Sequence, residues 1–343
     1  MAGMIKLANN HRFRGAIHAA GLLYLIGMAA LLIANHFLRP VSPFVALAST
    51  FNLYLYLAAL PLVGCLILLR TRAAIAILLL LVALFLVTHP VLPPVSAILP
   101  EKSRGPTVSA MTFNLGLSLT SPDQLAQTIA AAQADIVAVQ EMTDQSAAVL
   151  AAELAAYPYQ ISDTAIASTG FFSKLPILGY QWLYPPDGRP FLHVVVDQKG
   201  TDWHIFPIHF YPPGIVWSET RPLPRGIIET DLESEVAYML QQVAGVAEPV
   251  VVLGDFNMSD QSHAYAAITA SLQDSFRQAG FGLGRTFPNN FRLAGVRLPF
   301  PLVRIDYVFH SPHLATTAAT VNCVEGQSDH CAVLVVLKAK EPR

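Results

Sequence analysis

The chain has 343 residues, of which 53% are hydrophobic and only 13% are charged, a balance that excludes an ordinary, wholly soluble protein. The charge is unevenly distributed. The first 100 residues hold six basic residues and no acidic one, whereas the remainder holds 15 basic and all 23 acidic residues and therefore carries −8. This asymmetry indicates two different environments along one chain.

Three apolar runs lie in the first segment, at 16–38, 44–69 and 73–92. A helix needs about 20 apolar residues to cross a bilayer, and none of the runs has a polar face, so we expect a membrane domain of three transmembrane helices in residues 1–92. A cleaved signal peptide is disfavoured because two more runs follow the first. Lys and Arg are more frequent in the N-terminal tail and second loop than in the first loop. This pattern predicts an integral protein of the cell membrane with a cytoplasmic N-terminus and an extracytoplasmic C-terminal part.

A proline-rich linker is expected at 93–106, followed by one further domain at 107–340. That domain contains two cysteines, Cys323 and Cys331, eight residues apart on neighbouring expected strands. A disulfide is possible outside the cytoplasm, but pairing geometry is strict, so the sequence favours two buried thiols.

Apolar runs with turn residues between them predict many strands and few helices in 107–340. We expect strands at 107–114, 135–140, 170–174, 191–197, 203–209, 249–253, 303–309, 316–321 and 331–337. Helices are expected at 122–133, with Ser121 as its N-cap, and at 147–156, 227–245 and 262–272. This order predicts an α+β fold, a four-layer α/β/β/α sandwich in which two sheets pack face to face with helices outside.

Polar side chains stand at or near the ends of these apolar runs. They are Asn114, Glu141, His209, Asp255, Asn257, Asp306, Asp329 and His330. A sheet that delivers such groups to one rim can build a metal-assisted hydrolytic site. Each has a structural alternative when taken singly: Asp255 and Asn114 as turn or capping residues, Glu141 as a helix cap, and Asp306 in an ion pair with Arg304.

The ordered set, with Gly-Asp-Phe-Asn at 254–257 and Ser-Asp-His at 328–330, resembles the endonuclease/exonuclease/phosphatase superfamily, which has the deoxyribonuclease I-like fold. The resemblance covers about residues 107–340, and the apolar front end is similar to a group of membrane-attached members. It implies a metal-dependent hydrolase of phosphoric esters. Nuclease-type members often carry a second acid two residues after the first Asn, where this chain has Gly116.

In this interpretation the metal is Mg²⁺ or Mn²⁺. Glu141 and Asp329 are hard oxygen ligands of the kind these ions prefer. Asn114 either orients Glu141 or touches the ion through its carbonyl oxygen.

The remaining residues act on water and on the phosphoryl group. Asp255 accepts a proton from the attacking water, and Asn257 fixes the water or a phosphoryl oxygen. His209 and His330 donate hydrogen bonds to the phosphoryl oxygens. Asp306 holds one of the two imidazoles in its tautomer.

The substrate is less well defined by the sequence. The acidic segment without a basic run disfavours nucleic acid, and the bilayer favours a small or lipid-borne phosphoester, as in the similar sphingomyelinase-like branch. A metal-dependent nuclease stays the alternative, ahead of an inactive membrane-anchored binding protein. Segment 211–226 is either a substrate loop, with Arg221 or Arg225 reaching phosphate, or an ordinary surface loop. The oligomeric state stays open.

Overall fold

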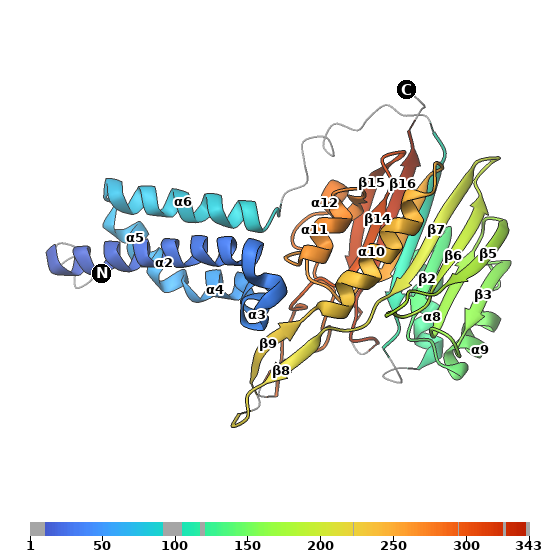
Figure 1. Ribbon diagram of the computed structural model, residues 1–343, viewed down its shortest axis with the longest axis horizontal. Coiled ribbons are helices and arrows are strands. Elements are labelled where there is room, and N and C mark those ends of the chain that lie inside the picture. Colours follow the sequence, from blue (N-terminus) through green and yellow to red (C-terminus); the bar gives the residue numbers. More distant parts are fainter. Residues whose placement is uncertain are drawn as a thin grey trace. The chain divides into compact units, whose positions relative to one another are not determined.

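The computed structural model describes residues 11–91, 105–116, 121–221, 223–293, 295–324 and 327–340. The chain forms two compact units, and Figure 1 labels the elements of both. One unit combines Met1–Val91 with Ile215–Ile228, and the other combines Leu92–Gly214 with Glu229–Arg343. All but the last two residues of the expected linker at 93–106 lie outside the described residues.

The first unit consists of apolar helices and one hairpin. Its helices are α2 (His11–Leu38), the 3-10 helix η1 (Arg39–Val41), α3 (Pro43–Thr50), α4 (Asn52–Ala58), α5 (Leu60–Leu69) and α6 (Arg72–Thr88). A cluster around Leu66, Ile77 and Leu81 joins α5 and α6, with Tyr24 of α2 packed against it. Gly21 of α2 faces the same cluster, where an added Cβ would lie 3.2 Å from Leu66.

The expectation of three membrane spans is not met. Among the described residues, His11–Val41 is the one single helical stretch long and apolar enough to cross a membrane, and a signal sequence near the N-terminus would pass the same test. The second apolar run is divided, with α4 and α5 bent by 47° at the break before Pro61; the two pass the same test only when they are taken together as one span. Proline lacks the N–H that a continuous helix needs there. The third run forms α6, an apolar helix shorter than a span.

A hairpin of β8 (Gly214–Trp217) and β9 (Pro224–Ile228) belongs to the helical unit. A Cβ added at Gly226 would lie 2.4 Å from the Cβ of Pro43, so only glycine allows β9 to approach α3 this closely. Trp217 and Leu223 are more than half exposed. The sequence predicted a helix from residue 227, but the strand extends to Ile228 and α10 (Thr230–Ala244) begins after it.

The second unit is built on two mixed six-stranded sheets. The first sheet has the order β15 (Leu314–Asn322), β16 (Ala332–Ala339), β1 (Thr107–Asn114), β2 (Ile136–Gln140), β4 (Thr169–Ser173), β3 (Tyr159–Asp163). The second has the order β11 (Gln273–Asp274), β14 (Asp306–His310), β10 (Val250–Asp255), β7 (Asp202–His209), β6 (Phe191–Asp197), β5 (Ile177–Leu183). The pairs β1–β2 and β7–β10 are parallel, so their carboxyl ends meet at one edge of each sheet.

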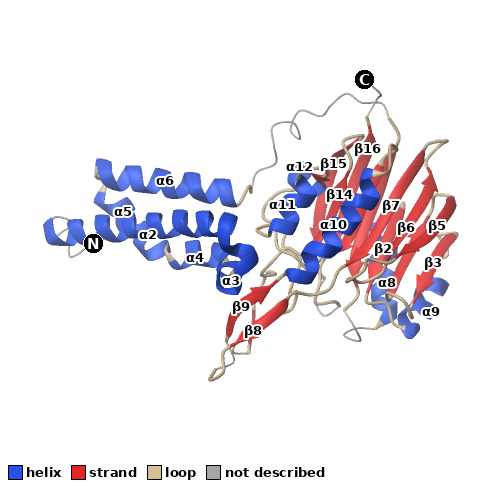
Figure 2. Cartoon of the chain, in the orientation of Figure 1, coloured by secondary structure: helices blue, strands red, loops and turns tan. Residues whose placement is uncertain are grey.

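Three apolar layers show that the predicted four-layer sandwich is formed (Figure 2). The central layer, which includes Ala110, Trp203 and Val251, lies between the sheets. One outer layer lies under α8 (Pro122–Ala132) and α9 (Asp144–Glu153), and the other lies under α10 and α11 (His263–Thr269). The short helix α12 (Ser275–Ala279) adds Phe276 to the central layer, and β12 (Arg292–Leu293) pairs with β13 (Val296–Arg297).

Two local predictions need comment. Ser121 is the N-cap residue of α8, as predicted, but its hydroxyl bonds the Asp123 carboxylate instead of a backbone N–H. Cys323 and Cys331 form a disulfide rather than two thiols. Since Asn322 and Ala332 are directly paired across β15 and β16, the two cysteines occupy the next opposed position, and their Cα atoms are 4.3 Å apart.

Candidate active site

The carboxyl end of β10 places three polar residues in one row of the second sheet. Asp255 is paired with His209 of β7 on one side and with Asp306 of β14 on the other. Residues opposite one another in neighbouring strands project to the same face, so the register alone brings these three side chains together. Gly254 is required by close packing, because an added Cβ would lie 1.8 Å from the carbonyl oxygen of Ile208.

Asn114, at the end of β1, connects the two sheets. Its Nδ2 donates to Asp255 Oδ2 at 2.9 Å and to Glu141 Oε1 at 3.2 Å. Its Oδ1 accepts a hydrogen bond from the backbone N–H of Gly116 at 3.0 Å. The buried amide therefore links Glu141 to Asp255, and its side-chain oxygen accepts a hydrogen bond from the backbone.

Two of the predicted residues have a left-handed backbone, with φ of 57° at Glu141 and 50° at Asn257. Residues other than glycine rarely adopt this conformation, and it occurs preferentially at functional sites. The turn lets the Asn257 backbone N–H donate to Asp255 Oδ1 at 2.9 Å, while its Nδ2 donates to the Phe210 carbonyl oxygen at 2.9 Å. Asn257 thus holds the Asp255 carboxylate in place.

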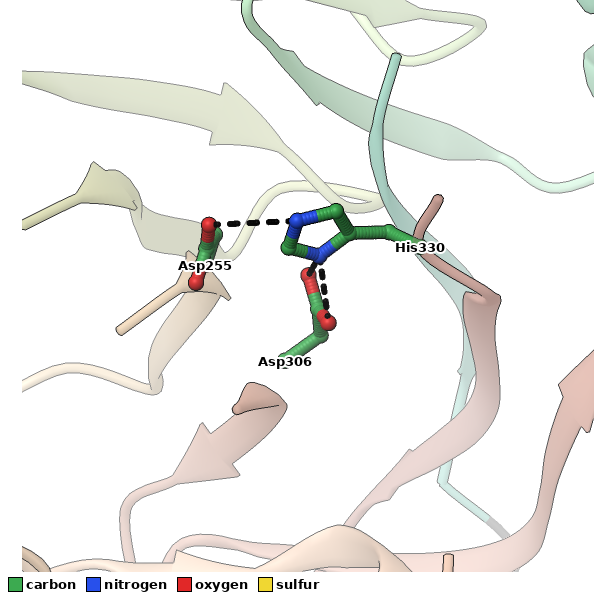
Figure 3. Close-up of side chains that lie close together, drawn as sticks. All are labelled: Asp255, Asp306 and His330. Carbon is green, nitrogen blue, oxygen red and sulfur yellow. Dashed lines mark hydrogen bonds and ion pairs between the residues drawn. The ribbon is translucent and has the colours of Figure 1, made fainter. Parts of the chain in front are cut away.

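His330 lies between two carboxylates (Figure 3). Its Nδ1 is 3.0 Å from Asp306 Oδ2, and its Nε2 is 3.9 Å from Asp255 Oδ2. Asp306 is not the partner of Arg304, because Arg304 pairs with Asp274, so the structural alternative for Asp306 does not hold.

His209 is buried on the other side of Asp255. Its Nε2 is 3.8 Å from both Asp255 Oδ2 and Glu141 Oε1, which is longer than a hydrogen bond. Its Nδ1 is buried and has no hydrogen-bond partner among the described residues. An imidazole with an unused nitrogen inside a polar cluster is suited to contact a ligand.

Burial and charge set different protonation states for these groups. Burial alone would lower the pKa of His330, but Asp306 and Asp255 together raise it to about 10. Burial raises the pKa of Asp255 to about 7, against the opposing effect of His330. Burial, Arg189 and His330 hold the pKa of His209 well below 6.5. At neutral pH the cluster therefore contains a charged His330, a neutral His209 and an Asp255 able to exchange a proton.

Glu141 and Asp329 fit the role of metal ligands. Burial raises the pKa of Asp329, and the nearby Glu141 carboxylate raises it further. Asp329 Oδ1 is buried with no hydrogen-bond partner among the described residues. Two neighbouring carboxylates, one with an unused oxygen, match the hard oxygen ligands of Mg²⁺ or Mn²⁺.

A second group of potential ligands consists of Asp255, Asp306 and His330, whose donor atoms lie within 4.8 Å of one another. In this group Nδ1 of His330 is hydrogen-bonded to Asp306, whereas Asp329 Oδ1 has no hydrogen-bond partner among the described residues. Both groups are candidates for holding a cation.

Arg221 and Arg225 lie on the β8–β9 hairpin and belong to the helical unit, so they stay a prediction. The structure adds two residues to the cluster. Ser328 belongs to the Ser-Asp-His motif, in which the sequence predicts no separate role for it. Its hydroxyl donates to the Asn114 carbonyl oxygen at 2.7 Å and accepts from the His330 N–H at 3.0 Å. Thr286 was not identified from the sequence; its Oγ1 accepts from the backbone N–H of Asp306 at 3.2 Å.

Comparison with known proteins agrees with this geometry. Residues 111–330 match the model of the Endonuclease/Exonuclease/phosphatase family. The chain belongs to this family. Members of the superfamily are usually phosphoester hydrolases and generally use divalent metals. The search of curated proteins found no match.

Solved structures of family members share the fold. An endonuclease/exonuclease/phosphatase from Bacteroides vulgatus is 20% identical, with a TM-score of 0.53 and coverage of 68% of this chain and 100% of its own. TDP2 from C. elegans is 16% identical, with a TM-score of 0.54 and coverage of 71% and 79%. TDP2 from D. rerio, complexed with single strand DNA product, is 17% identical, with a TM-score of 0.54 and coverage of 68% and 99%. At these identities the likeness establishes the fold alone.

Proposed function

We propose that this family member is a membrane-anchored, divalent-metal-dependent phosphoesterase that hydrolyses a phosphodiester or phosphomonoester by in-line attack of water. The observation that carries the proposal is the connected polar set around Asp255. Asn114 joins Asp255 to Glu141, and His330 joins the same region to Asp306. These residues come from both sheets and converge on one rim.

Asp255 is the proton acceptor for the attacking water. A pKa raised to about 7 suits a general base near neutral pH, and Asn114 and Asn257 hold its carboxylate in position. His330 is the main donor to the phosphoryl oxygens, because the carboxylate of Asp306 keeps it protonated and leaves Nε2–H directed into the site.

His209 is a neutral donor or acceptor on the opposite side of Asp255. A divalent cation, Mg²⁺ or Mn²⁺, held by Glu141 and Asp329 would neutralise the charge that develops on the phosphoryl oxygens. The protein residues supply positioning, which is the larger part of catalysis in phosphoryl transfer.

Membrane attachment is supported by the apolar helix His11–Val41 and by the exposed Trp217 and Leu223 of the neighbouring hairpin. Orientation follows from the basic N-terminal residues, which favour a cytoplasmic N-terminus and an extracytoplasmic catalytic unit. The disulfide between Cys323 and Cys331 supports the same placement, since disulfides persist in oxidising compartments.

A small or lipid-borne phosphoester is the proposed substrate. Residues 101–343 carry −8, so binding to a duplex would gain little from release of counterions. Nuclease activity is the competing function. The relative that was solved with single strand DNA product is only 17% identical, so it shares the fold without indicating the substrate.

The test uses the full-length protein in detergent with Mg²⁺, with Mn²⁺ or with a chelator. The substrates are sphingomyelin, glycerophospholipids, phosphate monoesters, RNA and plasmid DNA. We expect chelator-sensitive hydrolysis of a lipid or small ester, lost in Glu141→Gln and Asp329→Asn but kept in Glu153→Gln, which changes an exposed carboxylate at the end of α9. Full activity in excess chelator contradicts the metal role. Plasmid cleavage that falls steeply with added salt contradicts the proposed substrate class.

A further inference from the structure

Glu235 is a completely buried carboxylate that the proposed chemistry does not use. Its Oε1 accepts the backbone N–H of Arg189 at 2.7 Å, and its Oε2 accepts the backbone N–H of Tyr211 at 3.0 Å. A Cβ added at Gly188 would lie 2.4 Å from Glu235 Cγ, so the turn closes tightly over this carboxylate. Buried carboxylates are costly, and here both oxygens serve to connect two separate segments of chain.

One of those segments continues directly from the candidate active site. Tyr211 lies two residues after His209, and the intervening Phe210 donates its N–H to the Asp255 carbonyl oxygen at 3.1 Å. The Phe210 carbonyl oxygen accepts from Asn257 at 2.9 Å. The position of Tyr211 is therefore tied to the residues that surround Asp255.

The other segment is the turn between β5 and β6, which carries Arg189. Its guanidinium carbon lies 4.8 Å from the centre of the Tyr211 ring. The Arg189 charge lowers the pKa of the Glu235 carboxylate, which burial raises, without an ion pair between the two side chains among the described residues.

We propose that Arg189 is the substrate-binding arginine of this enzyme, and that it receives nonbridging oxygens of the substrate phosphate beside His209. Tyr211 and Glu235 are its positioning residues. This inference rests on the proposed function and names the contact by which the same site selects an anionic phosphoester.

Charge balance explains why the site needs such a residue. The cluster contains the carboxylates of Glu141, Asp255, Asp306 and Asp329, and His330 is the one protein cation among the cluster residues named above. A divalent cation held by Glu141 and Asp329 would offset those two carboxylates, which leaves Asp255 and Asp306 to repel a phosphate. Arginine presents a planar fork of N–H donors that matches two phosphate oxygens, and stacking on tyrosine holds that plane. Arg221 and Arg225, the sequence-based candidates, belong to the helical unit instead.

The decisive measurement is the affinity of the full-length protein in detergent for inorganic phosphate with Mg²⁺ present, by titration calorimetry. The KM for bis(p-nitrophenyl) phosphate is measured in parallel. We expect Arg189→Ala to weaken phosphate binding and raise KM by roughly 10- to 100-fold, as for loss of hydrogen bonds to a charged group. Arg189→Lys keeps the positive charge but loses the planar pair of N–H donors. Its phosphate affinity and KM should therefore lie between those of the wild type and those of Arg189→Ala.

Matched variants separate positioning from folding. Tyr211→Phe keeps the stacking ring and should bind phosphate normally, whereas Tyr211→Ala should weaken binding. Glu235→Gln should weaken it too, with little added effect in the Arg189→Ala background, because both act through one guanidinium. Arg221→Ala and Arg225→Ala should leave phosphate affinity unchanged.

The outcomes distinguish this inference from the proposed function. Arg189-dependent phosphate binding without hydrolysis of any phosphoester supports the inference and contradicts the enzyme. Hydrolysis with less than a twofold change of KM and of phosphate affinity in Arg189→Ala overturns the inference and leaves the enzyme intact. A larger loss of phosphate affinity in Arg221→Ala or Arg225→Ala than in Arg189→Ala also overturns the inference, because the β8–β9 hairpin would then supply the substrate-binding arginine.

Discussion

Replacement of Asp255 by Asn tests the central residue of the site, because it removes the negative charge and keeps the shape. Asp255 is buried, it accepts hydrogen bonds from Asn114 and Asn257, and its Oδ2 is 3.9 Å from His330 Nε2. Loss of a general base commonly lowers turnover by roughly 10²- to 10⁴-fold, so kcat should fall by that factor at pH 7.

The same substitution should make the stability of the metal-free protein depend less on pH, although Asn accepts only one of the two N–H groups that Asp255 accepts. Burial raises the pKa of Asp255 from 3.8 to about 7, so the folded state disfavours the ionised carboxylate. A shift of this size corresponds to at most about 4 kcal/mol of unfolding free energy. Below about pH 4 the carboxyl group is protonated in both states and the variant gains nothing. The gain grows as pH rises and is complete above about pH 7.

Two measurements on the full-length protein in detergent check this reasoning. One is kcat with Mg²⁺, and the other is the Tm in chelator at pH 3 and pH 8. Asp255→Asn should lose turnover, and its Tm relative to that of the wild type should be higher at pH 8 than at pH 3. A loss of turnover below about threefold would reassign the proton acceptor. A Tm difference that is the same at both pH values would refute the electrostatic description of the buried carboxylate.

Three further predictions concern the histidine, the disulfide and the topology. Asp306→Asn removes a carboxylate that raises the pKa of His330, so the alkaline limb of the pH–kcat profile should move to lower pH; an unchanged limb would show that His330 is not the donor. Replacing Cys323 and Cys331 together by Ser should lower the free energy of unfolding by roughly 2–3 kcal/mol, from the closure of a short loop, and denaturant titration with and without reductant measures it. An unchanged midpoint would mean that the disulfide adds no stability. Protease added outside right-side-out vesicles should digest the catalytic unit, and digestion only in inverted vesicles would reverse the charge-based orientation.

The sequence predicted the strands that position the site better than those at the sheet edges. Strands 107–114 and 191–197 have the bounds expected for β1 and β6, because each ends in a turn residue, Asn114 or Asp197. β3 and β5 were not predicted; each is an edge strand whose side chains are largely exposed, so neither forms a continuous apolar run. Hydropathy likewise joined α3, α4 and α5 into one run, because it averages over the break before Pro61.

Among the residues of the candidate site, some could be predicted from the sequence and others could not. His209 and Asp255 could be selected from the sequence because each stands at the end of an apolar run, and the register of β7, β10 and β14 then places Asp255 beside His209 and Asp306. The contact between Arg189, Tyr211 and Glu235 leaves no such pattern, since its members are separated by more than 20 residues and lie in two turns and a helix. Only the folded chain shows that they meet.

Residues on the loop before β16 need a different kind of support, because no strand holds Asp329 and His330 in register. The disulfide joins Cys331, directly after His330, to the end of β15. Asn289 contributes a second support, with its N–H donated to the Asp329 carbonyl oxygen at 2.5 Å and its Nδ2 to the Ser328 carbonyl oxygen at 3.1 Å. A phosphoryl-transfer site depends on placing its groups to within a fraction of an ångström. The loop therefore reaches by covalent and hydrogen-bonded constraints the rigidity that the strands supply to Asp255.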